Sequence, residues 1–116
     1  SLKDAIKRAN AYSAAGTDAI LIHSKKKKPN QIFQFAKVFR KSKFYKPMIA
    51  VPSTYSKTYE RELIKNDFKV VIYANQLLRA AYPQMLVTAK KILESGRAYD
   101  VEKDIGSIKE VLNLIK

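Results

Sequence analysis

The stretch Asp18-Ala-Ile-Leu-Ile-His-Ser24 decides the fold class of this chain. Residues 19–22 form a continuous apolar run, which is the pattern of a parallel strand buried on both faces. The run ends at His23, the only histidine in the sequence, and at Ser24. Ligands of α/β folds bind at the carboxyl ends of parallel strands. The stretch therefore predicts a parallel sheet and a candidate site at its edge.

The same pattern occurs twice more along the chain. Residues 48–51, Met-Ile-Ala-Val, run into Pro52-Ser-Thr54, and residues 70–73, Val-Val-Ile-Tyr, run into Ala74-Asn-Gln76. Successive runs begin 29 and 22 residues apart, which leaves room for a strand and a crossover helix. The sequence therefore predicts three parallel strands.

Segments with apolar residues at helical spacing surround these runs. The predicted helices cover residues 2–15, ended by Gly16 as a left-handed cap, then about 30–42, 59–65, 76–93 and a final amphipathic stretch within 105–115. Pro83 should kink the fourth helix or mark the end of an initial turn. Ser107 followed by Glu110 matches a capping box at the start of the last helix.

Composition excludes several classes of protein. The chain has 116 residues and is 47% hydrophobic, so we expect one globular unit at most. No apolar run approaches the eighteen or so residues of a membrane span, and no signal-peptide pattern opens the sequence, so a cytoplasmic protein is expected. The absence of cysteine excludes disulfides and thiolate metal sites.

The net charge of +13, from 23 Lys and Arg against 10 Asp and Glu, has three possible explanations. These are nucleic-acid binding focused on Lys25–Lys28, solvated helix faces, or steering of an anionic substrate. Most aromatic residues lie on apolar faces, and the other lysines scatter without forming one stripe. A nucleic-acid partner is therefore not expected, and the other two explanations stay open.

Four segments together resemble the phosphoenolpyruvate mutase branch of the isocitrate lyase superfamily. They are Ala-Asn-Ala-Tyr-Ser-Ala-Ala-Gly-Thr-Asp-Ala-Ile-Leu-Ile-His-Ser at 9–24, Ile-Ala-Val-Pro-Ser-Thr-Tyr at 49–55, Val-Ile-Tyr-Ala-Asn-Gln-Leu-Leu-Arg-Ala at 71–80, and Val-Glu-Lys-Asp-Ile-Gly-Ser-Ile-Lys-Glu-Val-Leu at 101–112. They follow the family's order and extend over nearly the whole chain.

The resemblance implies an α/β fold made of the last three βα units of a (β/α)8 barrel plus closing helices. Because a full barrel needs roughly 250 residues, residues 1–116 would form a single, incomplete partial-barrel unit, the carboxyl-terminal part of a larger catalytic domain. The family's enzymes interconvert phosphoenolpyruvate and phosphonopyruvate, the entry step to natural phosphonates, with Mg²⁺ holding the pyruvate part. Relatives hydrolyse phosphonopyruvate or cleave related acids.

Site residues follow from the matched motifs. The resemblance implies that His23 contacts the phosphoryl group at the end of strand six, where an imidazole N–H can donate to a phosphoryl oxygen. It also implies substrate-binding roles for Ser24, Asn75 and Arg79. From the residues alone, Ser24 could serve the turn, Asn75 could cap the next helix, and Arg79 could pair with a carboxylate outside this chain.

A metal site is not expected in this chain alone. Mg²⁺ needs several oxygen ligands, and none of the ten acidic residues ends a predicted strand. The resemblance places the metal ligands on earlier strands of a full-length parent. We therefore expect the isolated chain to be inactive and without a cofactor.

Two functional classes stay open, and one expectation concerns association. The chain is either the carboxyl-terminal part of a phosphoenolpyruvate mutase-like isomerase, or a non-catalytic basic module that binds anions, proteins or nucleic acid. The resemblance also implies a homo-oligomer that exchanges the helix near residues 83–93.

Overall fold

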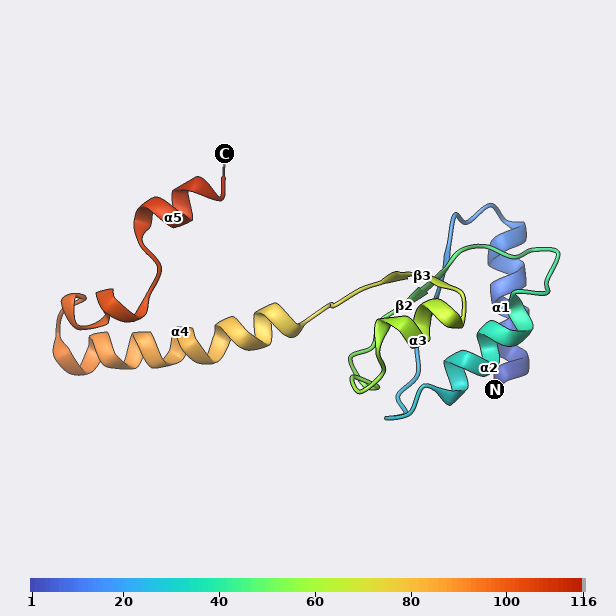
Figure 1. Ribbon diagram of the computed structural model, residues 1–116, viewed down its shortest axis with the longest axis horizontal. Helices are drawn as coiled ribbons and strands as arrows, with labels where there is room; N and C mark the ends of the chain where they lie inside the picture. Colours follow the sequence, from blue (N-terminus) through green and yellow to red (C-terminus); the bar gives the residue numbers. More distant parts are fainter. Residues whose placement is uncertain (116) are drawn as a thin grey trace. The chain divides into compact units, whose positions relative to one another are not determined.

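Three parallel strands form the sheet that carries the candidate site (Figure 1). The structure, a computed structural model, describes residues 1–115. Strands β1 (Ile20–Ile22), β2 (Met48–Ala50) and β3 (Phe68–Val71) pair in the order β1-β2-β3. The predicted parallel sheet is therefore confirmed, with β1 and β3 at its two edges.

Strand β3 begins and ends two residues earlier than the sequence pattern predicts. Met48 pairs with Phe68 and Ile49 pairs with Val70, so the register skips Lys69. The apolar pattern hides this start because exposed Lys69 interrupts it. Phe68 is only 2% exposed and packs into the core, and this burial extends the strand past the charged residue.

Three helices belong to the same unit as the sheet, α1 (Leu2–Ala14), α2 (Asn30–Phe39) and α3 (Glu60–Lys65). The predicted left-handed residue after α1 is confirmed, because Gly16 has φ +103°. The N–H of Gly16 donates to the carbonyl of Ser13, and the N–H of Thr17 donates to that of Tyr12. This pattern is a Schellman turn, which ends a helix where a residue without a Cβ can turn left-handed.

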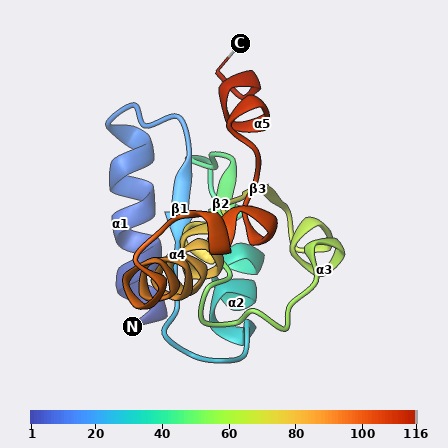
Figure 2. The same cartoon turned by 90° about the vertical axis from the view of Figure 1, so that its left-hand side faces the viewer.

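The core lies on one face of the sheet. Helix α2 buries the apolar stripe that the sequence predicted, Ile32, Phe35, Ala36 and Phe39, together with Met48 and Ala50 of β2 and Phe68 of β3. The opposite face is open, because Leu21 is 51% exposed and Val70 is 45% exposed. Figure 2 shows the three strands side by side. The sheet thus has one covered and one uncovered apolar face.

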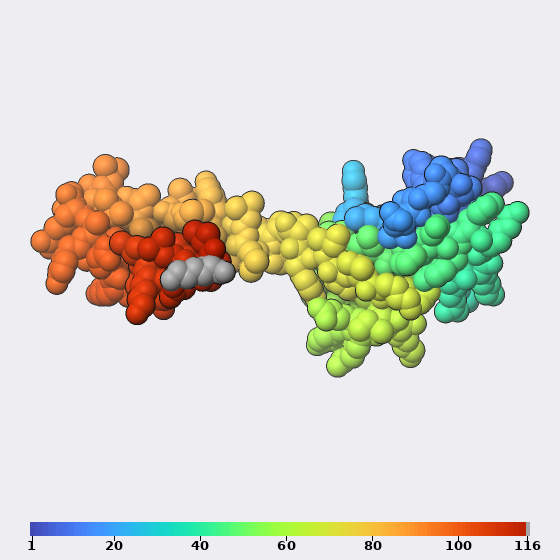
Figure 3. Space-filling view, turned by 90° about the horizontal axis from the view of Figure 1, so that it is seen from above, coloured from blue at the N-terminus to red at the C-terminus, as the bar shows by residue number. Residues whose placement is uncertain are grey.

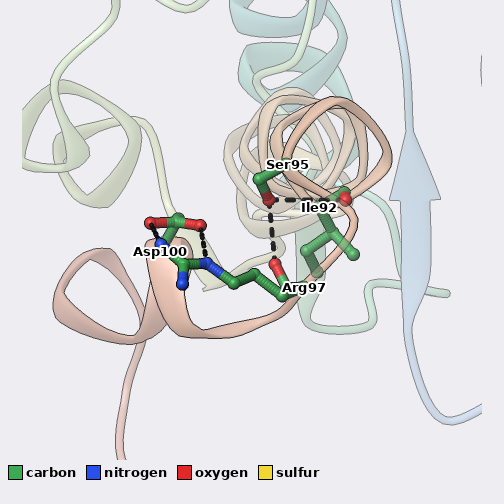
Figure 4. Close-up of polar contacts among 4 residues, drawn as sticks. All are labelled: Ile92, Ser95, Arg97 and Asp100. Atoms are coloured by element: carbon green, nitrogen blue, oxygen red, sulfur yellow. Dashed lines mark hydrogen bonds and ion pairs between the residues drawn. The ribbon is translucent and has the colours of Figure 1, made fainter.

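The second unit begins at Asn75 and contains α4 (Gln76–Ser95), the 3-10 helix η1 (Tyr99–Asp104) and α5 (Ile108–Asn113). Helix α4 continues through Pro83 and buries none of its residues. Its end is fixed by polar contacts: Ser95 donates to the carbonyl of Arg97, and the Arg97 guanidinium donates twice to the Asp100 carboxylate (Figure 4). Val101 is the one buried side chain among the described residues of this unit.

The predicted capping box is confirmed at α5. The Ser107 N–H donates to the Glu110 carboxylate at 2.7 Å, and the Glu110 N–H donates to Ser107 Oγ at 3.2 Å. The chain divides into two units, residues 1–74 and 75–116. The expectation that they form one partial-barrel unit stays a prediction.

Candidate functional site

His23 is the first residue after β1, at the carboxyl end of the strand. Its side chain is exposed, and its ring centroid lies 6.3 Å from that of Tyr55 with a tilt of 39°. The loop after β2 therefore supplies the aromatic neighbour of the histidine. This exposed position lets an imidazole N–H donate to a ligand at the carboxyl ends of the strands.

Ser24 anchors the chain where β1 ends. It is only 6% exposed, and its Oγ donates to Gln31 Oε1 at 2.6 Å while accepting from the Lys26 N–H at 3.1 Å. Its carbonyl accepts a hydrogen bond from Thr54 Oγ1 at 2.5 Å. Because the single hydroxyl proton of Ser24 goes to Gln31, the residue serves the turn in this structure. A direct contact between Ser24 and a substrate stays a prediction.

Tyr55 is the site residue whose role the sequence reasoning missed. The side chain is completely buried beside His23, and its hydroxyl has no hydrogen-bond partner of good geometry among the described residues. Burial raises the pKa of this hydroxyl, and the nearby Val51 backbone lowers it by less. A signal was present, since Tyr55 ends the motif at residues 49–55, but only the structure shows its contact with the histidine.

A cavity of about 300 Å³ lies next to His23, between α1 and α2. Its lining includes the polar side chains of Arg8, His23 and Gln31 and the apolar side chains of Ile22 and Phe35. A guanidinium and an imidazole in one cavity favour a negatively charged ligand. Neither Arg8 nor Gln31 was singled out by the sequence analysis.

Asn75 and Arg79 lie in the second unit, one turn apart at the start of α4. Asn75 occupies the N-cap position, but its side chain makes no capping hydrogen bond. Arg79 is exposed, and none of the ion pairs among residues 1–115 includes it. Substrate-binding roles for both residues stay predictions.

Comparison with known proteins identifies the family. The sequence model of phosphoenolpyruvate phosphomutase matches residues 1–93. This chain belongs to the phosphoenolpyruvate phosphomutase family. The phosphoenolpyruvate phosphomutase of Tetrahymena pyriformis is 38% identical over 113 residues, which are 97% of this chain and 37% of that protein.

Solved structures of phosphomutase relatives show the same fold. The phosphoenolpyruvate phosphomutase from Streptomyces platensis subsp. rosaceus is 35% identical with a TM-score of 0.83, over 97% of this chain and 38% of that one. A phosphonopyruvate hydrolase in complex with oxalate and Mg²⁺ is 32% identical with a TM-score of 0.83, over 98% of this chain and 40% of that one. The chain therefore spans about two fifths of the length of these relatives.

The described residues of this phosphomutase-family chain do not fit a Mg²⁺ ion. Mg²⁺ is held by carboxylates and other oxygens that converge on one point. No group of three or more His, Asp or Glu within residues 1–115 could hold a metal. Glu60, at the start of the helix that follows β2, instead accepts a hydrogen bond from Tyr73 at 2.5 Å. Within residues 1–115, the acidic side chains thus do not converge on one point as the ligands of Mg²⁺ do.

Within the described residues, no helix of this family member combines the length and the apolar character that crossing a membrane requires.

Proposed function

We propose that this chain is the carboxyl-terminal part of an isomerase that interconverts phosphoenolpyruvate and phosphonopyruvate. The observation that carries the proposal is the match to the phosphoenolpyruvate phosphomutase family over residues 1–93, with His23 at the carboxyl end of β1. The relatives' lengths support a complete protein in which these strands close an eight-stranded barrel.

The reaction moves a phosphoryl group within one molecule. The O–P bond of phosphoenolpyruvate breaks and a C–P bond forms at the methylene carbon, and the enol oxygen becomes the ketone of phosphonopyruvate. In this proposal the exposed imidazole of His23 donates a hydrogen bond to an oxygen of the phosphoryl group in transit. A donor aimed at that group stabilises the charge that develops in the transition state. Asn75 and Arg79 would bind the rest of the substrate.

Hydrolysis of phosphonopyruvate is a second candidate, because the solved hydrolase matches with a TM-score equal to that of the phosphomutase structure. The two reactions share a substrate and differ in product. Isomerisation yields phosphoenolpyruvate, whereas hydrolysis yields inorganic phosphate and pyruvate. The similarity of this chain to both relatives supports the common substrate.

Phosphorus NMR of a reaction mixture separates these functions. The complete protein that contains this chain is incubated with phosphonopyruvate and Mg²⁺, and the 116-residue chain is assayed in parallel. We expect phosphoenolpyruvate from the complete protein and no turnover by the isolated chain, because no group of three or more His, Asp or Glu within residues 1–115 could hold the metal. Inorganic phosphate as the product would assign the hydrolase reaction. No turnover by the complete protein would leave the non-catalytic, anion-binding module as the function.

The same proposal includes a homo-oligomer in the cytoplasm. Apolar side chains on α4 are open to solvent in the second unit, with Met85 56% exposed and Ile92 37% exposed. Helix exchange near residues 83–93 would cover them against another subunit, and burial of a few hundred Å² is worth several kcal/mol at about 25 cal/mol per Å².

A further inference from the structure

Four consecutive lysines, Lys25 to Lys28, follow the candidate site directly and have no part in the proposed chemistry. We call Lys25–Lys28 the tetralysine segment. All four residues are exposed, and none belongs to an ion pair among residues 1–115. Figure 3 shows light-blue side chains of this part of the chain projecting from the surface of the first unit. The segment thus presents four unpaired positive charges beside His23.

The first unit concentrates the charge of the chain. Residues 1–74 hold 16 Lys and Arg against 5 Asp and Glu, which leaves +11 of the chain's +13. Its acidic side chains are mostly engaged elsewhere: Asp67 pairs with Lys69, and Glu60 accepts from Tyr73. Asp18 precedes β1, whereas the tetralysine segment follows it, so they lie at opposite ends of the strand. Little negative charge is therefore available to neutralise the segment.

The start of the segment is fixed to the fold. Buried Ser24 accepts from the Lys26 N–H at 3.1 Å and donates to Gln31 of α2 at 2.6 Å. Thr54 Oγ1, from the loop after β2, donates a hydrogen bond to the Ser24 carbonyl oxygen at 2.5 Å. The backbone at the start of the segment is consequently held next to His23, at the carboxyl ends of the strands. A fixed charge cluster beside a site raises the local concentration of oppositely charged ligands.

We propose that the tetralysine segment captures small, multiply charged anions and raises their rate of arrival at His23. This inference rests on the proposed function for the identity of the natural anion, a phosphorylated or phosphono-substituted carboxylate. A short cluster at one strand end suits a small anion, because a nucleic-acid backbone needs charges spread along its path. The attraction acts over a distance of about one Debye length, roughly 8 Å at physiological ionic strength, so added salt must weaken it.

A binding experiment on the full 116-residue chain tests the segment without any activity. The variant K25Q/K26Q/K27Q/K28Q removes the four charges at the site. The matched control K37Q/K41Q/K43Q/K65Q removes the same charge from exposed lysines near the ends of α2 and α3. These helix ends lead into β2 and β3, on the side of the sheet where the strands begin. Inorganic phosphate is titrated by heteronuclear NMR at low and at high ionic strength, with the amides of the segment and the ring of His23 as probes.

We expect K25Q/K26Q/K27Q/K28Q to bind phosphate roughly tenfold more weakly than the wild type at low salt. The difference in affinity should disappear at high salt. The control should bind like the wild type. An equal loss in the control would mean that only net charge matters and would overturn the proposal. Equal binding by all three proteins would overturn it too. So would a segment that ignores phosphate yet binds a single-stranded RNA oligonucleotide.

Kinetics on the complete protein separate this inference from the proposed function. With phosphonopyruvate as substrate, K25Q/K26Q/K27Q/K28Q should lose about tenfold in kcat/KM at low salt, and the control should not. A complete protein with no turnover contradicts the isomerase, while the phosphate titration still decides the role of the segment. Turnover with equal kcat/KM in variant and wild type at every ionic strength contradicts the capture role alone.

Discussion

Thr54 donates a hydrogen bond to the carbonyl oxygen of Ser24, with 2.5 Å between Oγ1 and that oxygen. The two residues are thirty positions apart in the sequence and follow neighbouring strands, β1 and β2. The bond ties the loop after β2 to the turn that begins at His23. Together with the hydrogen bonds that Ser24 makes to Gln31 and Lys26, it fixes the chain where β1 ends.

Replacing Thr54 by valine keeps the side-chain shape and removes this bond. We expect the T54V variant to lose about 1 kcal/mol in the free energy of unfolding, because the carbonyl of buried Ser24 is left unpaired. Denaturant unfolding of wild type and variant measures the loss. The matched control is T58V on the same loop, whose hydroxyl makes no comparable link between loops, and which should change stability by less than about 0.5 kcal/mol. Equal losses in the two variants would show that the bond from Thr54 to the Ser24 carbonyl does not stabilise the fold.

Two buried or half-buried tyrosines should respond differently to loss of the hydroxyl. Tyr45 donates to the Asp67 carboxylate at 2.9 Å, so Y45F should destabilise the fold by about 1–2 kcal/mol. The hydroxyl of Tyr55 is buried without a partner of good geometry among the described residues, so Y55F should leave stability unchanged or raise it slightly. Thermal unfolding of the two variants makes the comparison. A larger loss in Y55F than in Y45F would show that a polar group such as the nearby Val51 backbone stabilises the Tyr55 hydroxyl.

Stability should fall on acidification because of Asp67. Hydrogen bonds from Lys69 first and Tyr45 second hold the pKa of Asp67 below its usual value of 3.8. A depressed folded-state pKa contributes stability that is present above the unfolded value and is lost as the pH falls toward the folded one. The D67N variant should therefore have a lower free energy of unfolding than the wild type near neutral pH. The difference between the two proteins should become smaller below about pH 4. Asparagine tolerates the positive φ of 70° at this position, so the backbone is unaffected.

Urea unfolding of both proteins across that pH range gives the measurement. A gap that stays constant from neutral pH to about pH 2 would show that Asp67 does not stabilise the fold through its charge.

In the complete protein, H23A should lower kcat/KM by roughly a hundredfold or more, as expected for a lost transition-state hydrogen bond. The exposed position of His23 predicts that folding stays intact, which circular dichroism and thermal unfolding check. H23Q restores a donor at this position and should recover part of the activity. Unchanged kinetics in H23A would make the histidine structural.

Self-association of the chain should depend on the apolar side chains of α4. At micromolar concentration, sedimentation equilibrium should show species larger than the monomer. M85E and I92E place a charge on the exposed apolar side and should weaken association at least tenfold. The control Q84E adds the same charge at a polar position of the same helix and should associate like the wild type. A compact, well-folded wild-type monomer would contradict the expected oligomer.

The sequence by itself determined the features that local physics controls. Continuous apolar runs predicted a parallel sheet, Gly16 supplied a left-handed residue after α1, and Ser107 with Glu110 capped α5, all of which the structure confirms. Each depends on neighbours within a few positions, whose spacing and chemistry can be read directly from the chain. His23 at a strand end came from the same reasoning, because an apolar run shows where its strand ends.

Only the tertiary structure decided the contacts between distant segments. Strand β3 starts at Phe68 because this side chain is buried against β2. The apolar run in the sequence begins only after the charged Lys69, so the pattern alone does not show this start. The bond from Thr54 to Ser24 and the packing of Tyr55 beside His23 join loops that follow different strands. Such contacts arise because parallel pairing brings the carboxyl ends of neighbouring strands together, and no periodicity within one segment encodes which side chains then meet.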